Sequence, residues 1–358
     1  CIRDSSTAEM QILSWIDKPV IVLLNQMGKP RTHAEEQADV AAWREAMAPY
    51  PFVKDILPMD AFARCWVQET ALFDSIGRAL PAQMRSTFDT LRDIWTRSRR
   101  ALYLSSVDAM ARHMWRLLQA HELVPTPTLK DHLRSFGSQI GLIKTRNEAL
   151  EDAQTALSAM AADSLCSLTD KLIGINGLTG SGVSREILRR MKTDWQMASH
   201  SISPGPAAAV GASVGVAGGA AAGAAADMAS AGLSLGLGTL LGGIIGAIGG
   251  VGAATIYNSR HRKEGIDISW SERAAQDFML ESLLLYLAVA HFGRGRGDWQ
   301  EGESPEFWKK AVQDAMTEQK VSFQAIRKLT PEEGVEQLTR MTDSLLRGVF
   351  MQLYERSI

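Results

Sequence analysis

The sequence predicts an α/β segment, residues 1–80, followed by a mainly α-helical domain, residues 81–358. In the first part, short aliphatic runs alternate with helical patterns, which is typical of the edge of a doubly wound parallel sheet. In the second part, apolar residues recur at helical spacing over long stretches. That part also contains a Gly/Ala-rich apolar segment, residues 207–256, which we expect to form a glycine-zipper hairpin.

Helices and strands are expected to alternate at the start of the chain. Apolar residues at helical spacing predict a helix over residues 5–16. Residues 20–24, Val-Ile-Val-Leu-Leu, are an unbroken aliphatic run, which indicates a strand buried on both faces of a parallel sheet. A second helix is expected over residues 32–47 and a second strand over residues 52–58.

Loops follow both expected strands at their carboxyl ends. Residues 25–30 read Asn-Gln-Met-Gly-Lys-Pro, and residues 59–62 read Met-Asp-Ala-Phe. Open α/β sheets bind their ligands outside the carboxyl ends of the strands. We therefore expect a ligand of this segment to bind at that edge.

The stretch Val-Ile-Val-Leu-Leu-Asn-Gln-Met-Gly, residues 20–28, resembles the strand and N-K-x-D loop with which Era-like GTPases of the translation-factor-related class read guanine. Residues 59–61, Met-Asp-Ala, stand where those proteins carry the next base-contacting loop. The wider chain, including residues 3–10 and the glycine-rich segment, looks like bacterial GTPases with a large C-terminal domain of unknown function.

The resemblance implies that residues 1–80 are the C-terminal half, a remnant, of a P-loop GTPase domain. It implies GTP and Mg²⁺ as cofactors of the intact protein. By the same resemblance, the nucleotide-binding positions are Asn25, Gln26, Gly28, Asp60 and Ala61.

Two of these positions depart from the family pattern. Gln26 replaces the usual lysine, and Gly28 replaces the aspartate that pairs with the guanine edge. Loss of a charge-assisted pair costs about 2 kcal/mol when it is buried, so we expect weaker selectivity for guanine. On local sequence alone, an Asn-Gly turn after a core strand is an equal alternative.

No catalytic residue is predicted, because the parts that bind phosphate and magnesium are not found before Asn25. A phosphate-binding G-x-x-x-x-G-K-[ST] loop should precede the base-reading loop by a long distance. Residues 177–184 match part of that pattern, but Val183 stands where the lysine is required. We expect the first half of the GTPase domain to lie before Cys1 and this chain alone to be inactive.

From Trp66 onward we expect helices throughout, which makes residues 81–358 an all-helical domain. Proline pairs and glycine-rich loops divide the helical patterns. The patterns cover residues 66–80, 84–123, 130–173, 185–198, a buried core helix at 278–292, a helix opened by 304–306, and a last helix from 330 to 353.

The apolar segment 207–256 contains Asp227 as its only charged residue. Its glycines recur every fourth residue in two sets, 211–223 and 238–250, so each set forms one stripe of a helix. Stripes of this kind allow close helix packing in lipid, and the length suffices for two membrane-embedded helices. A hairpin packed inside a protein core is the alternative.

Basic residues flank this segment on both sides. Arg189, Arg190 and Lys192 precede it, and residues 260–263, Arg-His-Arg-Lys, follow Tyr257. Cations beside an apolar span favour the cytoplasmic face of a membrane. An ordinary solvated run of charges is the alternative.

Composition excludes several classes of function. Lys and Arg number 38 against 40 Asp and Glu, so the net charge of −2 gives no electrostatic basis for binding nucleic acid. The cysteines, Cys1, Cys65 and Cys166, are far apart, which fits a reducing compartment. Neither they nor the scattered histidines form a metal-binding pattern, so no metal ligands are predicted.

We therefore expect the C-terminal part of a bacterial GTPase that couples its nucleotide state to a membrane-associated helical domain. Expected partners are a guanine nucleotide, membrane lipid and further copies of the chain through the hairpin. The expected location is the cytoplasm, peripheral or integral at the inner membrane. One alternative is a non-enzymatic membrane-interacting protein with a degenerate nucleotide fold. Another is a soluble helical scaffold with the hairpin buried in an oligomer.

Overall fold

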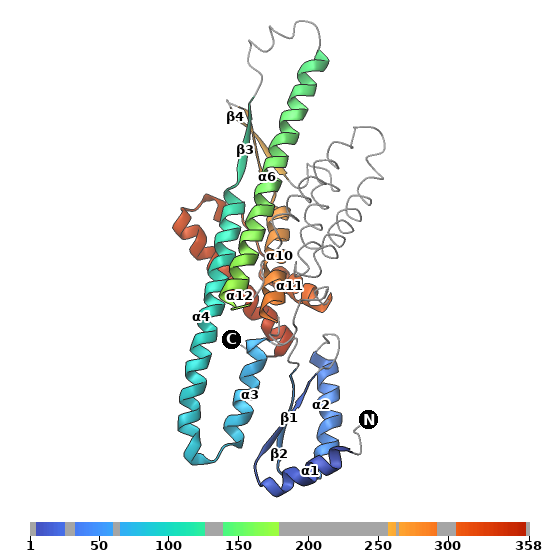
Figure 1. The fold of residues 1–358 in the computed structure, drawn as a ribbon. Coiled ribbons are helices and arrows are strands. Elements are labelled where there is room, and N and C mark those ends of the chain that lie inside the picture. The colour runs from blue at the N-terminus through green and yellow to red at the C-terminus, as the bar shows by residue number, and fades with distance from the viewer. Residues whose placement is uncertain are drawn as a thin grey trace.

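The computed structural model describes residues 5–25, 33–59, 65–125, 139–178, 257–262, 265–291 and 306–355. The described part is mostly helical, with a few short strands (Figure 1). The apolar segment 207–256 and its expected glycine zipper lie outside the described residues.

The beginning of the chain has the predicted alternation of helix and strand: α1 (Ser5–Ile16), β1 (Val20–Leu24), α2 (His33–Met47) and β2 (Val53–Pro58). β1 and β2 pair in parallel, as their separation by a helix requires. A small hydrophobic core holds this unit together and consists of Met10, Leu24, Val40, Met47 and Ile56.

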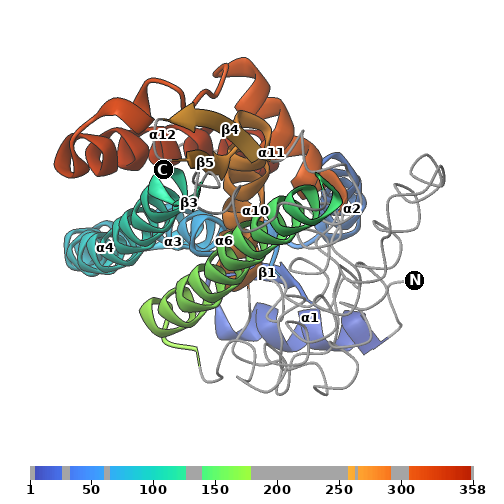
Figure 2. The same cartoon turned by 90° about the horizontal axis from the view of Figure 1, so that it is seen from above.

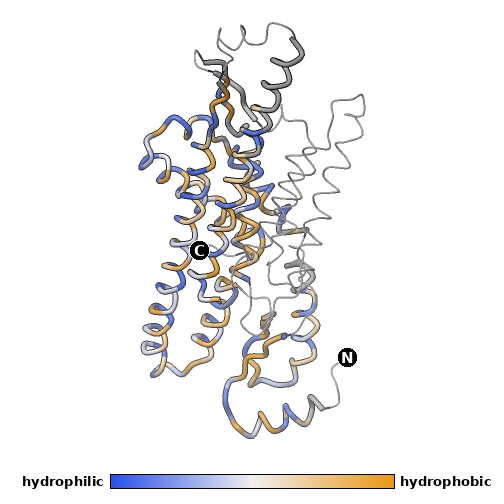
Figure 3. The backbone as a smooth tube through the Cα atoms, turned by 45° about the horizontal axis from the view of Figure 1, so that its top comes forward, coloured by the Kyte–Doolittle hydropathy of each residue, from blue (hydrophilic) through white to orange (hydrophobic). Residues whose placement is uncertain are grey.

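The expectation that the first strand is buried on both faces is wrong. In β1 only Leu24 is buried, and Leu23 is 43% exposed. Among the described residues, β1 has one neighbouring strand, β2, so its other edge is open. Its side chains are nevertheless mostly hydrophobic, as the orange tube in this part of Figure 3 shows. The aliphatic run therefore predicted the strand correctly but overestimated its burial.

Two helices, α3 (Trp66–Ala79) and α4 (Ala82–Gln119), form an antiparallel pair that turns at Leu80 and Pro81 (Figure 1). Aromatic rings join them: Phe73 lies 5.9 Å from Phe88 and 4.7 Å from Trp95, measured between ring centroids. α4 is one uninterrupted helix. Its second half leaves α3 and enters the main core.

The main core is helical and buries α10 (Glu272–Ala290) at its centre, in agreement with the predicted core helix. Figure 2 shows α10 among α4, α6 and α11 when the molecule is viewed from above. The other helices of this core, besides α4, are α6 (Gln139–Ile175), α11 (Glu306–Glu318), a short 3₁₀ turn η2 (Ile326–Lys328) and α12 (Pro331–Tyr354).

Capping residues begin two of these helices: α12 starts where the sequence predicted, whereas α10 starts at Glu272, before the predicted residue 278. Thr330 caps α12, since its hydroxyl accepts from the Glu333 amide while the Glu333 side chain accepts from the Thr330 amide. Ser271 caps α10 by accepting from the Ala274 amide at 3.1 Å. At the end of α6, Gly177 has a φ of 64°, a left-handed conformation that glycine adopts without strain.

The expectation of an all-helical second domain is wrong, because three strands form a sheet at the end of the molecule away from β1 and β2 (Figure 1). Its strands are β3 (His121–Pro125), β4 (Tyr257–Arg262) and β5 (Gly265–Trp270), and β5 is central, with an antiparallel neighbour on each side. Of the basic residues after Tyr257, Arg260, His261 and Arg262 therefore belong to a strand, in which Arg260 lies opposite Asp267.

Two buried histidines and a largely buried glutamate make the stability of this core dependent on pH. Burial lowers the pKa of His113 to about 4, where its Nδ1 lies 2.9 Å from the Ser164 hydroxyl of α6. Burial likewise lowers the pKa of His291 to about 4. Burial has the opposite effect on Glu281, an acid, and raises its pKa to about 7.

We expect the free energy of unfolding to fall by about 3 kcal/mol between pH 6.5 and pH 4.5. The unfolded histidines take up protons below about pH 6.5, whereas the folded ones do not until about pH 4, so each costs about 1.4 kcal/mol per pH unit. Folded Glu281 binds a proton that the unfolded chain does not, which offsets about half of this loss. Urea titrations at several pH values measure how the free energy of unfolding changes with pH.

Glu281→Gln and His113→Gln test this account in opposite directions. The first removes the compensating group and should make the loss on acidification about twice as steep. His113→Gln removes one of the two histidines that destabilise the fold in acid. Its free energy of unfolding should then hardly change between pH 6.5 and pH 4.5. The account fails if either variant keeps the wild-type slope.

Candidate functional site

The candidate site is the edge of the small sheet where β1 and β2 end. Leu24 lies opposite Pro58 at the last paired position, and the Met59 amide donates to the Leu24 carbonyl at 3.0 Å. Asn25, which is exposed, follows Leu24 directly. The structure thus brings the starts of the two predicted base-contacting loops to one edge.

The other predicted nucleotide-binding residues, Gln26, Gly28, Asp60 and Ala61, lie outside the described residues. Their loops are nevertheless bounded on the described side by Asn25 and Met59, which extend from neighbouring strands. The convergence of the two loops themselves stays a prediction.

A polar cluster that sequence reasoning missed fastens β2 to α3. Asp55 of β2 accepts hydrogen bonds from the Ser75 hydroxyl and, at 2.8 Å, from the Arg78 guanidinium. Partial burial alone would raise the pKa of Asp55, but these bonds and one from the Ile56 amide outweigh burial and lower it. Asp55 therefore stays ionised at neutral pH and holds α3 against the strand.

The first turn of α3 belongs to the core of the helical domain. Cys65 has no exposed surface and Val67 is 1% exposed, and both pack in the main core. The Trp66 ring lies 6.0 Å from that of Tyr103 in α4. α3, which precedes the predicted boundary at residue 80, thus contacts both the helical core and β2.

Burial also decides the chemistry of Cys65. It raises the pKa of the thiol to about 12, so the thiol stays protonated at neutral pH and is a poor nucleophile. Cys65 instead caps α3, and its backbone amide donates a hydrogen bond to the Gln68 side-chain oxygen at 3.0 Å.

Tyr103 continues this connection from α4 to α12. Its hydroxyl donates to the Asp343 carboxylate at 2.7 Å, and the Arg347 Nε donates to the same carboxylate at 2.8 Å. The Tyr286 ring of α10 lies 6.2 Å from the Tyr103 ring. A continuous set of contacts therefore runs from the start of α3 to three helices of the main core.

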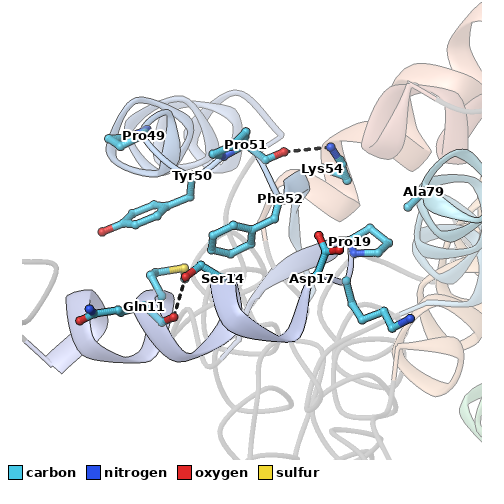
Figure 4. A pocket seen from close by; sticks show the side chains of 12 residues that line it. Gln11, Ser14, Asp17, Pro19, Pro49, Tyr50, Pro51, Phe52, Lys54 and Ala79 are labelled. Carbon is cyan, nitrogen blue, oxygen red and sulfur yellow. Dashed lines mark hydrogen bonds between the residues drawn. The ribbon is translucent and has the colours of Figure 1, made fainter.

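A pocket lies at the opposite, amino-terminal end of the strands (Figure 4). It is lined by α1, through Gln11 and Ser14, and by the segment before β2, through Tyr50 and Phe52. The Lys54 ammonium at its rim donates to the Pro51 carbonyl at 2.9 Å. This pocket is therefore separate from the edge at which the sequence predicts nucleotide binding.

The described residues offer neither a metal site nor a membrane-spanning helix. No group of three or more His, Cys, Asp or Glu side chains there is placed to hold a metal ion. No helix in the same ranges is long and apolar enough to cross a membrane. Residues 207–256, where the membrane hairpin is predicted, are outside these ranges.

The helical part of the chain matches a known but uncharacterised family. A protein-family model described as a domain of unknown function, DUF3482, matches residues 196–345. The match begins before the apolar segment, includes β4, β5, α10 and α11, and ends within α12. No curated protein and no solved structure matches the chain.

Proposed function

We propose that this chain is the C-terminal part of a GTP-binding protein, a GTPase, that couples its nucleotide state to the helical domain. The observation that carries the proposal is the parallel pairing of β1 and β2, which brings Asn25 and Met59 to one edge. In a nucleotide-binding α/β fold, this is the edge at which loops contact the base. GTP and Mg²⁺ are the proposed cofactors of the intact protein.

The coupling is proposed to pass through α3. Its first turn packs against Tyr103 and Tyr286 of the helical core, while Ser75 and Arg78 near its end bind Asp55 of β2. A helix fixed at both ends moves as a unit. A displacement of the chain before Cys65 would therefore be transmitted by α3 directly to the helical core.

The helical domain is proposed to act at a membrane through residues 207–256. The support is their length, their low charge and the fourfold spacing of their glycines. The proposed location is accordingly the cytoplasm, peripheral or integral at the inner membrane. A non-enzymatic membrane-interacting or scaffold protein is the alternative, favoured by the absence of the lysine and aspartate at Gln26 and Gly28.

Asn25→Ala is expected to weaken GTP binding by the intact gene product about tenfold. Removing one side-chain hydrogen bond to the bound base costs about 1.4 kcal/mol, which corresponds to that factor. Titration with a fluorescent GTP analogue in the presence of Mg²⁺ measures the dissociation constant. Competition by GDP, ATP and XTP measures how selectively a site with Gln26 and Gly28 binds guanine.

Lys54→Ala is the matched control, because Lys54 lies at the pocket on the amino-terminal side of the same strand pair. It should leave GTP affinity unchanged. If Lys54→Ala weakens binding and Asn25→Ala does not, the nucleotide occupies the other end of the strands. If the wild-type protein binds no nucleotide, the scaffold alternative replaces the GTPase proposal.

A further inference from the structure

We draw no further inference here: the strongest candidate, the apolar surface patch that Ile12, Trp15 and Ile16 expose on α1, carries none, because nothing among the described residues shows what covers it.

Discussion

Gly334→Ala is expected to lower the free energy of unfolding by about 3 kcal/mol, although alanine normally stabilises a helix by about 1 kcal/mol over glycine. Gly334 lies in the first turns of α12, where α12 crosses α4. A Cβ at this position would lie 2.0 Å from a ring carbon of Trp115. The indole or the whole helix must move to admit it, and α12 and α4 share the most extensive contact between helices of the fold.

Gly348→Ala, in the same helix, is the matched control. There a Cβ would lie 3.6 Å from the Ala315 Cβ, an ordinary contact, so alanine should stabilise by up to about 1 kcal/mol. Trp115→Ala should remove the penalty, so that Gly334→Ala becomes neutral or stabilising in that background. Chemical denaturation of the four combinations gives the coupling energy. No coupling between positions 115 and 334 would refute the packing described for α4 and α12.

Arg327→Met is expected to destabilise the protein by about 3 kcal/mol. Arg327 lies in η2, and its guanidinium donates to the Leu118 carbonyl at 2.9 Å and to the Trp270 carbonyl at 3.0 Å. It thus joins the end of α4 to the end of β5. Methionine preserves most of the volume but leaves both carbonyls without this donor, and bonds to charged donors are worth about 1.5–3 kcal/mol each.

Arg340→Met controls for the loss of an arginine charge. Arg340 is exposed and pairs with Glu336 one turn earlier at 3.0 Å, so the change should cost only a few tenths of a kcal/mol. Arg327→Lys should fall between the two, because one ammonium group cannot reproduce the fork that reaches both carbonyls. Urea titration at neutral pH compares the three variants. Equal stability of Arg327→Met and Arg340→Met would contradict the bridging role.

Local chemistry made much of the fold predictable. The aliphatic run of β1, the Thr330-Pro331 start of α12 and the apolar pattern of α10 each depend on neighbours within one or two turns. Two of the three strands of the second sheet, β3 and β4, could not be predicted this way, whereas β5 reads Gly-Ile-Asp-Ile-Ser-Trp and has the apolar alternation that the prediction overlooked. β3 pairs with residues far along the chain, and β4 reads Tyr-Asn-Ser-Arg-His-Arg, without the apolar alternation that indicates a strand.

The candidate site, too, could be predicted only where it depends on local sequence. That the loops after β1 and β2 share an edge follows from parallel pairing, which the helix between the strands indicated. The Asp55–Ser75–Arg78 cluster and the contact of Trp66 with Tyr103 were not predictable, because they join residues whose separation has no helical or strand period. The predicted boundary at residue 80 stays a prediction. α3 looks like the last helix of one domain, but its first turn is packed in another.

The position of β5 between β3 and β4 has a mechanical consequence. β3 ends at Pro125, opposite Gly265, and β4 begins at Tyr257, opposite Trp270, so the chain leaves and re-enters the sheet at opposite ends of β5, about 17 Å apart along that strand. A pulling force applied to residues 207–256 would load the β4–β5 ladder on one side and the packing of α6 against α4 on the other. Both attachments would have to rupture before the segment could be drawn away from the core.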